Sequence, residues 1–424
     1  MEKRELMTAL RRGSRGLTVV AALLSGVLTL TACSGGDDND DGANPGASQE
    51  EADDAAANAD TSAAEISITP EDAAENVGIN SDVQVSVENG TLDEVTMTAT
   101  ESGTEVSGTF SEDETSWTPD VQLERATRYQ LTVQASDSEG RAAHESVTFT
   151  TVSPEDSFIG YFTPEDGSTV GVGMPISLNF DKPITNRAEV EEAVEITASS
   201  GQEVVGHWFS DTRLDFRPQQ YWEANTEVSV ELNWDGLEGS PGVYGVQDRS
   251  FSFTVGRSQI STVDVETHQM EVVRDGETLR TLPITAGSPE TPTYNGQMVI
   301  SEKHKETRMN GATVGFTDDD GEGEYDIPDV PHAMRLSTSG TFVHGNYWGG
   351  DVFGNANTSH GCIGLADVQG ADDPDTDGAW FYENSLLGDV IIVVNSPDEV
   401  MQPDNGLNGW NMNWSDWVAG SALS

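Results

Sequence analysis

The residues of this sequence that could perform chemistry are a cysteine and two histidines. Cys362 directly follows Ser359, His360 and Gly361, and a Gly- and Asn-rich loop separates this run from His344. A thiol has an unperturbed pKa of about 8.5, so at neutral pH it attacks well only when a nearby base or cation assists it. Histidine can accept the thiol proton and later return it to a leaving amine. The pattern therefore predicts nucleophilic catalysis by Cys362.

His344 is the better candidate for the base. Residues i and i+2 of an extended chain lie about 6.5 Å apart, and the glycine before Cys362 indicates a turn, so His360 need not face the sulfur. Gly361 lets a substrate approach the backbone closely, and the amides of Gly361 and Cys362 are natural donors to an oxyanion. We expect Ser359 and His360 to shape the pocket.

A zinc site built from His344, His360 and Cys362 is an alternative. Zinc sites usually take more protein ligands in good geometry, and the only other cysteine of the chain is Cys33. We therefore expect neither a metal nor an organic cofactor. A further alternative is that Cys362 and His344 have only a structural role, as buried core residues.

The segments 342–346 (Phe-Val-His-Gly-Asn) and 359–365 (Ser-His-Gly-Cys-Ile-Gly-Leu) resemble the catalytic signature of the L,D-transpeptidases. The resemblance extends over about residues 259–396. It implies that the backbone carbonyl of Gly345 orients the ring of His344. Many members carry Arg or Asn two residues after the cysteine, whereas this sequence has Gly364. If that side chain holds a substrate carboxylate, its role must pass elsewhere or to backbone amides.

The resemblance also implies an activity. Cys362 would attack the third residue of a peptidoglycan tetrapeptide stem, release D-Ala, and pass the acyl group to a diaminopimelate-type amine, which gives a 3→3 cross-link. Carbapenem-type inhibitors would acylate the same thiol. One alternative is an L,D-carboxypeptidase of the same fold, in which water is the acceptor. Another is a non-catalytic wall-binding lipoprotein. Four residues are candidates for substrate binding, with core packing as the alternative: Met309, Tyr347, Trp348 and Asn357.

Short alternating runs must position these residues. In the predicted catalytic domain, residues 257–396, strands are expected at 261–265, 269–273, 281–287, 296–300, 341–344 and 389–394, with a short helix at 379–383. The polar segment 303–329 is long for a connection, and such segments are often lids. It contains the acidic run 318–324.

Two similar segments precede this domain, at residues 65–153 and 154–256. Thr-Pro-Glu-Asp occurs at 69–72 and again at 163–166, and alternating strand-like runs follow in the same order. Such runs between turn residues are typical of antiparallel β-sandwiches. The predicted fold class is thus mainly β, with two immunoglobulin-like domains followed by a β-rich catalytic domain with little helix. We favour a spacer role for the two sandwiches over a binding role.

The ends of the chain predict its location. Residues 1–33 have a basic start, an apolar run and a Leu-Thr-Ala-Cys sequence that resembles a lipoprotein signal, with Cys33 as the lipidated residue. Residues 34–64 predict an acidic, disordered tether. We therefore expect a protein held by its lipid on the outer face of the plasma membrane, exposed to the cell wall.

The net charge of −54 argues against nucleic-acid binding, because such proteins need Lys and Arg to replace counterions.

The C-terminal tail, residues 397–424, contains three tryptophans at helical spacing. Trp410, Trp414 and Trp417 would lie on one face of a helix. By the family resemblance the tail packs back onto the chain, and a sugar-stacking face is the alternative.

Overall fold

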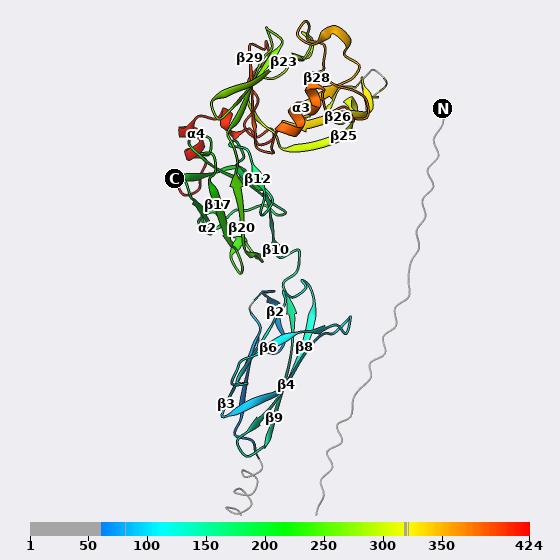
Figure 1. The fold of residues 1–424 in the computed structure, drawn as a ribbon. Helices are drawn as coiled ribbons and strands as arrows, with labels where there is room; N and C mark the ends of the chain where they lie inside the picture. Colours follow the sequence, from blue (N-terminus) through cyan, green and yellow to red (C-terminus); the bar gives the residue numbers. More distant parts are fainter. Residues whose placement is uncertain (1–60, 81, 318–319, 321) are drawn as a thin grey trace, which may run out of the picture. The chain divides into compact units, whose positions relative to one another are not determined.

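The computed structural model describes residues 61–80, 82–317, 320 and 322–424 (Figure 1). The predicted signal peptide with Cys33, and the tether as far as residue 60, lie outside the described residues. Thr61–Ser424 forms one compact unit. Its strands dominate and its helices are short, so the predicted fold class is confirmed. Within the described part of the chain, no helix has both the length and the apolar character needed to cross a bilayer.

The first sandwich combines a four-stranded sheet, β1-β3-β7-β6, with a five-stranded sheet, β2-β9-β8-β4-β5. Alternate residues of its strands are buried, as in β8, because successive side chains of a strand point to opposite faces. Its strands are β1 (Glu65–Thr69), β2 (Ala74–Val77), β3 (Gln84–Glu88), β4 (Gly90–Ala99), β5 (Glu105–Val106), β6 (Gly108–Phe110), β7 (Ser116–Pro119), β8 (Arg128–Asp137) and β9 (Ala142–Thr151).

The second sandwich has two four-stranded sheets, β11-β13-β16-β15 and β12-β20-β17-β14, and a small sheet, β10-β19-β18. Its elements are β10 (Ser157–Phe158), β11 (Gly160–Thr163), β12 (Thr169–Val170), β13 (Ile176–Phe180), α2 (Arg187–Glu192), β14 (Val194–Ala198), β15 (Val204–Ser210), β16 (Arg213–Pro218), β17 (Glu227–Asn233), β18 (Glu238–Ser240), β19 (Val243–Gly245) and β20 (Asp248–Val255). The residue limits that we assign to the domains remain predictions.

The repeated Thr-Pro-Glu-Asp sequence makes the same contact in both sandwiches. The carboxylate of Asp72 accepts a hydrogen bond from the amide of Thr148 at 2.8 Å. The carboxylate of Asp166 accepts one from the amide of Ser252 at 2.9 Å. The sequence repeat therefore reflects a repeated structure, in which an Asp shortly after β1 or β11 accepts from an amide of the last strand of its sandwich, β9 or β20.

The predicted catalytic domain is built on a nine-stranded sheet in the order β24-β29-β21-β22-β23-β28-β27-β26-β25. The predicted helix at 379–383 is confirmed as α3. The elements are β21 (Gln259–Asp264), β22 (Gln269–Arg274), β23 (Glu277–Thr285), β24 (Gly296–Val299), β25 (Glu302–Asn310), η1 (Gly311–Val314), β26 (Asp326–Arg335), β27 (Phe342–Asn346), η2 (Gly350–Val352), β28 (Ile363–Ala366), α3 (Asp377–Asn384) and β29 (Val390–Val394). The tail that follows contains η3 (Gly409–Asn411) and α4 (Trp414–Ala419).

The expected long connection at residues 303–329 is wrong at both ends, and only residues 311–325 connect the two strands. Its two ends are the strands β25 and β26, which pair antiparallel over their whole length. The sequence of β25, Glu-Lys-His-Lys-Glu-Thr-Arg-Met-Asn, lacks the alternation of a half-buried strand, so its pairing with β26 decides its structure. Of the acidic run expected to form a lid, residues 318, 319 and 321 lie outside the described residues.

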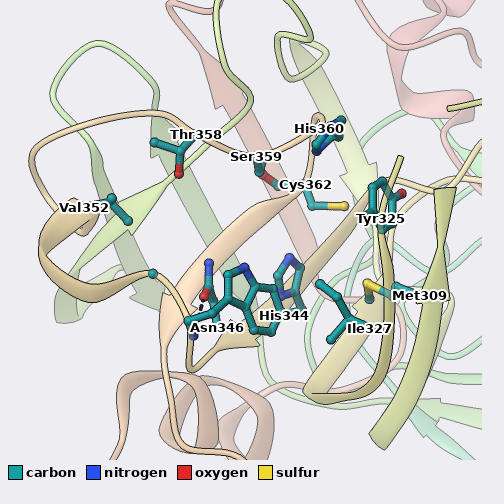
Figure 2. A pocket seen from close by; sticks show the side chains of 12 residues that line it. Met309, Tyr325, Ile327, His344, Asn346, Val352, Thr358, Ser359, His360 and Cys362 are labelled. Atoms are coloured by element: carbon teal, nitrogen blue, oxygen red, sulfur yellow. Dashed lines mark hydrogen bonds between the residues drawn. The ribbon is translucent and has the colours of Figure 1, made fainter. Parts of the chain in front are cut away.

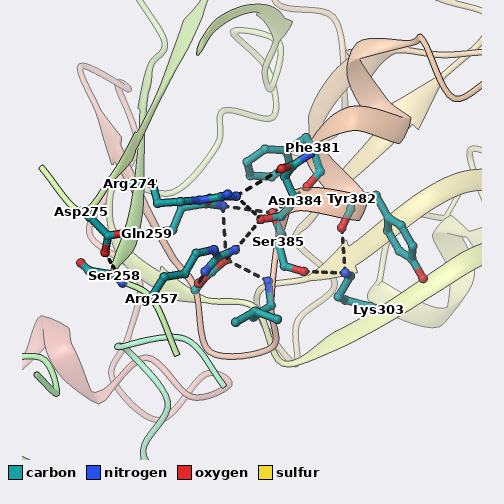
Figure 3. A network of polar contacts seen from close by, with 12 residues as sticks. Arg257, Ser258, Gln259, Arg274, Asp275, Lys303, Phe381, Tyr382, Asn384 and Ser385 are labelled. Atoms are coloured by element: carbon teal, nitrogen blue, oxygen red, sulfur yellow. Dashed lines mark hydrogen bonds and ion pairs between the residues drawn. The ribbon is translucent and has the colours of Figure 1, made fainter. Parts of the chain in front are cut away.

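Basic side chains cap the C-terminal end of α3 (Figure 3). Arg274 of β22 donates to the carbonyl of Asn384 at 2.9 Å, and Lys303 of β25 donates to the carbonyl of Tyr382 at 2.7 Å. Arg257 also donates to the Asn384 carbonyl. The last carbonyls of a helix have no partner within the helix and lie at the negative end of its dipole. These cations therefore fix α3 against the sheet.

The tail packs around an arginine of the second sandwich. The guanidinium carbon of Arg217 lies 4.7, 5.3 and 4.3 Å from the ring centroids of Trp410, Trp414 and Trp417. Its Nη2 donates to the carbonyl of Met412 at 3.0 Å. Burial lowers the pKa of Arg217 to about 10. The tail thus packs back onto the chain, and the three indoles, divided between η3 and α4, surround a cation.

Candidate active site

The pairing of β27 with β28 brings the chemically active residues together. The two strands are parallel, with His344 directly opposite Gly364. Cys362 lies immediately before β28. Because side chains two residues apart share a face of a sheet, Cys362 and position 364 face the same side as His344. The register of this pair therefore brings the predicted base and nucleophile to one side of the sheet.

The Cys362 thiol is buried, with 9% of the residue exposed. It donates to the carbonyl of Gly340, with 3.6 Å between sulfur and oxygen. Burial raises the pKa of Cys362 to about 11, and the amide of Phe342 and the charge of Arg335 offset only part of this effect. The resting group is therefore the neutral thiol, which needs a base at the moment of attack.

His344 is held by a backbone carbonyl. Its Nδ1 lies 2.7 Å from the carbonyl oxygen of Gly345. A carbonyl oxygen only accepts, so Nδ1 carries the proton and Nε2 of the neutral ring keeps a free lone pair. Burial lowers the pKa of His344, and the hydrogen bond to Gly345 and the charge of Asp367 oppose that shift. At neutral pH the ring is thus uncharged and able to accept a proton.

A buried carboxylate lies behind Gly345. A Cβ added at Gly345 would lie 2.1 Å from Oδ2 of Asp367, so only glycine fits there. The same carboxylate accepts hydrogen bonds from Nδ1 of His332 at 2.7 Å and from the hydroxyl of Thr376 at 2.9 Å. Asp367 therefore joins β26 and the start of α3 behind the segment that orients His344. The sequence motif gave no signal for this residue.

His360 faces the β25–β26 hairpin. Its Nε2 lies 3.2 Å from a carboxylate oxygen of Glu324, and 37% of its side chain is exposed. Its ring centroid lies 5.0 Å from that of Tyr325 and 5.5 Å from that of Phe316. His360 lines the pocket, but its contacts join the motif to the segment between the two strands.

Ser359 and Gly361 shape the turn before the nucleophile. The hydroxyl of Ser359 donates to the carbonyl of Cys362 at 2.6 Å and accepts from the amide of Gly361 at 3.2 Å. Gly361 has a φ of 105°, a region that residues with a Cβ rarely adopt. These contacts hold the chain in a tight turn that directs the Cys362 side chain into the pocket.

The pocket over these residues has a volume of about 320 Å³. Figure 2 shows Met309, Tyr325 and Ile327 on one side of Cys362 and His344, and Val352 on the other. Predicted site residues that line the pocket are Met309, His344, Trp348, Ser359, His360 and Cys362. Lining residues that the sequence analysis missed are Tyr325, Ile327, Asn346, Gly349, Val352 and Thr358.

Three of the four candidate substrate-binding residues have other contacts. The ring of Trp348 stacks on that of His344, with centroids 5.8 Å apart, while 44% of the residue is exposed. Tyr347 does not line the pocket, and its hydroxyl donates to Asp329 at 2.7 Å. Asn357 does not line it either. Its side chain accepts from the amide of Ala286 at 2.9 Å and donates to the carbonyl of Val265 at 3.0 Å, which ties the loop to the sheet.

Over residues 61–424, apart from the four undescribed positions in that range, the structure has no group of three or more His, Cys, Asp or Glu side chains arranged to hold a metal ion.

Known proteins share this architecture. The L,D-transpeptidase catalytic domain model matches residues 258–393, and a bacterial Ig domain model matches residues 74–238. L,D-transpeptidase 2 of Mycobacterium tuberculosis is 33% identical over 351 residues, which cover 83% of this chain and 83% of that protein. L,D-transpeptidase 5 of the same species is 30% identical over 366 residues, or 84% and 77% of the two chains.

A solved L,D-transpeptidase structure in complex with imipenem is 31% identical, covers 55% of this chain and 97% of that chain, and has a TM-score of 0.46. The similarity to L,D-transpeptidases 2 and 5 shows the family of this chain, because the identity extends over most of both proteins in each pair. This chain belongs to the L,D-transpeptidase family.

Proposed function

We propose that this protein is a cysteine-dependent peptidoglycan transpeptidase that forms 3→3 cross-links through a thioester on Cys362. One observation carries the proposal. The buried ring of His344 donates through Nδ1 to the carbonyl of Gly345, which leaves Nε2 as a base on the side of the sheet that carries the thiol. A neutral thiol and a neutral oriented imidazole form a nucleophile and base pair of the kind that acyl transfer requires.

In the first step, the sulfur of Cys362 attacks the carbonyl carbon of the third stem residue, and Nε2 of His344 takes the thiol proton. The carbon–sulfur bond forms as the carbon–oxygen double bond opens to an oxyanion. When the carbonyl re-forms, the bond to the nitrogen of the terminal D-Ala breaks. His344 gives its proton to that nitrogen, so D-Ala leaves as a neutral amine and the thioester remains.

The amide of Cys362 is our first candidate for an oxyanion donor, because a backbone N–H next to a nucleophile points near the atom under attack. The amide of Gly361 already donates to Ser359 at 3.2 Å, so it would share its proton between the hydroxyl and the oxyanion.

In the second step, a side-chain amine of a diaminopimelate-type residue on a neighbouring stem attacks the thioester carbon. His344 accepts a proton from the attacking nitrogen and returns it to the sulfur as the carbon–sulfur bond breaks. The products are a 3→3 amide bond and the original thiol, so the reaction needs no oxidant and no cofactor. Water in place of the amine would give the L,D-carboxypeptidase reaction.

Incubation with a tetrapeptide stem tests this proposal. We expect an increase in the mass of Cys362 equal to the tripeptide acyl group, followed by a cross-linked dimer of stems. Release of tripeptide without dimer would favour the carboxypeptidase. The absence of any adduct, with stem peptides and with a carbapenem alike, would favour the non-catalytic wall-binding lipoprotein.

We also propose that the protein is an actinobacterial-type lipoprotein, anchored through Cys33 to the outer face of the plasma membrane. The proposal rests on the Leu-Thr-Ala-Cys sequence at the end of the apolar run and on the mycobacterial source of the relatives. The full-length protein and its Cys33→Ser variant should be compared by detergent-phase partitioning. We expect only the wild type to enter the detergent phase, and equal partitioning would show that the apolar run is itself the anchor.

A further inference from the structure

The missing side chain at position 364 leaves a space that another residue fills. Gly364 lies opposite His344 on the parallel strand pair. A Cβ added at Gly364 would lie 2.8 Å from the methyl carbon of Thr285 and 3.4 Å from the side-chain nitrogen of Asn346. A Cβ at 364 would therefore clash with the methyl group of Thr285 and would come into van der Waals contact with the amide of Asn346 on β27, which lies beside the empty position.

The amide group of Asn346 has a defined orientation. Its oxygen accepts a hydrogen bond from the backbone amide of Trp348 at 3.0 Å. Because that backbone group is a donor, the atom it contacts must be the oxygen and not the nitrogen. The nitrogen then lies between Gly364 and Gly349, since an added Cβ would be 3.4 Å from it at the first position and 3.2 Å from it at the second. The residue is 6% exposed, and it lines the pocket.

The nitrogen of Asn346 lacks an acceptor in the described part of the protein. Hydrogen bonds of the described residues account for its oxygen but not for Nδ2. The nitrogen is not among the described polar atoms that are fully buried without a partner, so it is accessible from the pocket that Asn346 lines, and its two N–H donors are open to an acceptor there. A donor that faces a pocket beside a nucleophile and its base can be satisfied by an oxygen of the bound substrate.

The position of this donor determines which oxygen it can reach. Gly364 follows Cys362 by two residues, so the two Cα atoms are about 6.5 Å apart in an extended chain. The oxygen of the carbonyl under attack stays near the sulfur, because both atoms are bonded to the same carbon. The amide of Asn346 is thus better placed for a second acceptor oxygen of the acyl donor, beyond the reacting carbonyl.

We propose that Asn346 is a substrate-binding residue, whose side-chain nitrogen donates to a carboxylate or amide oxygen of the stem residue that acylates Cys362. This inference rests on the proposed function. The side chain of Asn346 on β27 would then make the hydrogen bond to the substrate, because Gly364 on β28 has no side chain that could make it. The donor is uncharged, so it selects for an acceptor oxygen without requiring a negative charge.

Two substitutions separate this role from a structural one. Asn346→Asp keeps the oxygen that accepts from Trp348, but it replaces the donor by a second acceptor. Asn346→Ala removes both groups. We expect each variant to lower kcat/KM for acyl transfer from a tetrapeptide stem by about 10- to 100-fold, the effect of losing a hydrogen bond to a polar or charged oxygen. Wild-type kcat/KM in Asn346→Asp would overturn the inference.

A small reagent provides the control for the nucleophile. Iodoacetamide alkylates Cys362 without the stem contacts, so its rate should stay within about threefold of wild type in both Asn346 variants, a change too small for a lost hydrogen bond. A parallel loss of alkylation would mean that Asn346 acts on the thiol and not on the substrate, and would also overturn the inference. If wild-type protein is alkylated but never acylated by stems, the proposed function fails and this inference falls with it.

Moving the amide to β28 is the sharpest test. The variant Asn346→Ala with Gly364→Asn and Thr285→Ser restores a donor from the neighbouring strand. Thr285→Ser removes the methyl group that lies 2.8 Å from the new Cβ and keeps the hydroxyl that donates to the Ala356 carbonyl at 2.8 Å. Its matched parent is Asn346→Ala with Thr285→Ser.

We expect the relocated amide to recover at least about fivefold in kcat/KM over that parent, since a hydrogen bond to a polar group is worth about that much. Thermal unfolding of both proteins checks that the comparison is between folded chains. No recovery in a variant that unfolds at the same temperature as its parent would contradict the inference.

Discussion

The two sides of the pocket are held by different forces. On one side, Cys362, His344 and Asn346 are each less than 10% exposed; His344 and Asn346 lie on β27, and Cys362 directly precedes its partner strand β28. On the other side, Met309 and Tyr325 are half-buried, and the hairpin that carries them is joined to the motif by an ion pair at the surface. We call these the strand wall and the hairpin wall. Strand register thus fixes the geometry of the strand wall, whereas a contact at the surface joins the hairpin wall to the motif.

The largest effect should come from the nucleophile of the strand wall. Cys362→Ala removes the atom that forms the thioester, so we expect no carbapenem adduct and no cross-linked stems. Intact-protein mass spectrometry measures the adduct, and circular dichroism checks the fold. An adduct that persists in Cys362→Ala would mean that another residue is acylated.

The next largest effect distinguishes the two histidines. His344→Ala should slow acylation by about 10²- to 10⁴-fold, the usual contribution of a positioned acid–base group. His360→Ala, which alters the contact with the hairpin wall, should slow it by less than about tenfold, because it removes only an exposed ion pair and ring contacts. Stopped-flow measurement of carbapenem acylation gives both rates. The reverse order would exchange the roles that we assign to the two residues.

The pH dependence of acylation and of alkylation should reflect the burial of His344 and Cys362 in the strand wall. Above its pKa an imidazole is mostly neutral and can act as a base. Because burial lowers the pKa of His344 below its usual value of about 6.5, acylation should lose rate only below that pH. Because the pKa of Cys362 is raised to about 11, alkylation by iodoacetamide should still be increasing at about pH 9.5. A plateau of alkylation near pH 8 would contradict the buried neutral thiol.

The smallest effect should come from the hairpin wall. Glu324→Gln removes the partner of His360, and exposed ion pairs contribute only about 0–1 kcal/mol. We expect less than about a threefold change in acylation rate at low ionic strength and a smaller one at about 0.15 M salt, because added salt weakens exposed charge contacts, although this pair, 3.2 Å apart, lies within the screening length of roughly 8 Å. Glu306→Gln, on the same hairpin, is the matched control for lost charge. A tenfold change in the acylation rate of Glu324→Gln, without such a change in Glu306→Gln, would show that the contact between Glu324 and His360 controls access to the pocket.

The sequence predicted the strand wall better than the hairpin wall, for a physical reason. Cys362 and His344 stand in a linear pattern of uncommon residues, which can be read without knowing the fold. Asn346 was missed, although its position two residues after His344 on a strand indicates the same face. Asp367 was missed because only the packing of β26, β27 and α3 brings it behind Gly345.

The hairpin wall could not be predicted from local pattern. Strand β25 alternates neither in hydrophobicity nor in burial, so nothing in its own residues distinguishes it from a loop. Its structure depends on β26, and that pairing is a long-range property. The sandwiches were predicted well, because strands with one buried face, such as β17, carry regular alternation in the sequence itself.

The bond from His344 to the carbonyl of Gly345 has an evolutionary consequence. The group that orients the base belongs to the main chain, so no codon change at position 345 can delete it. Mutation can act there only by adding bulk, which the carboxylate of Asp367 blocks at 2.1 Å from the Cβ position. Any side chain that displaces the carbonyl also disturbs the base, so selection should leave position 345 unchanged. Heritable variation should accumulate instead on the hairpin wall, where substitutions leave the base untouched.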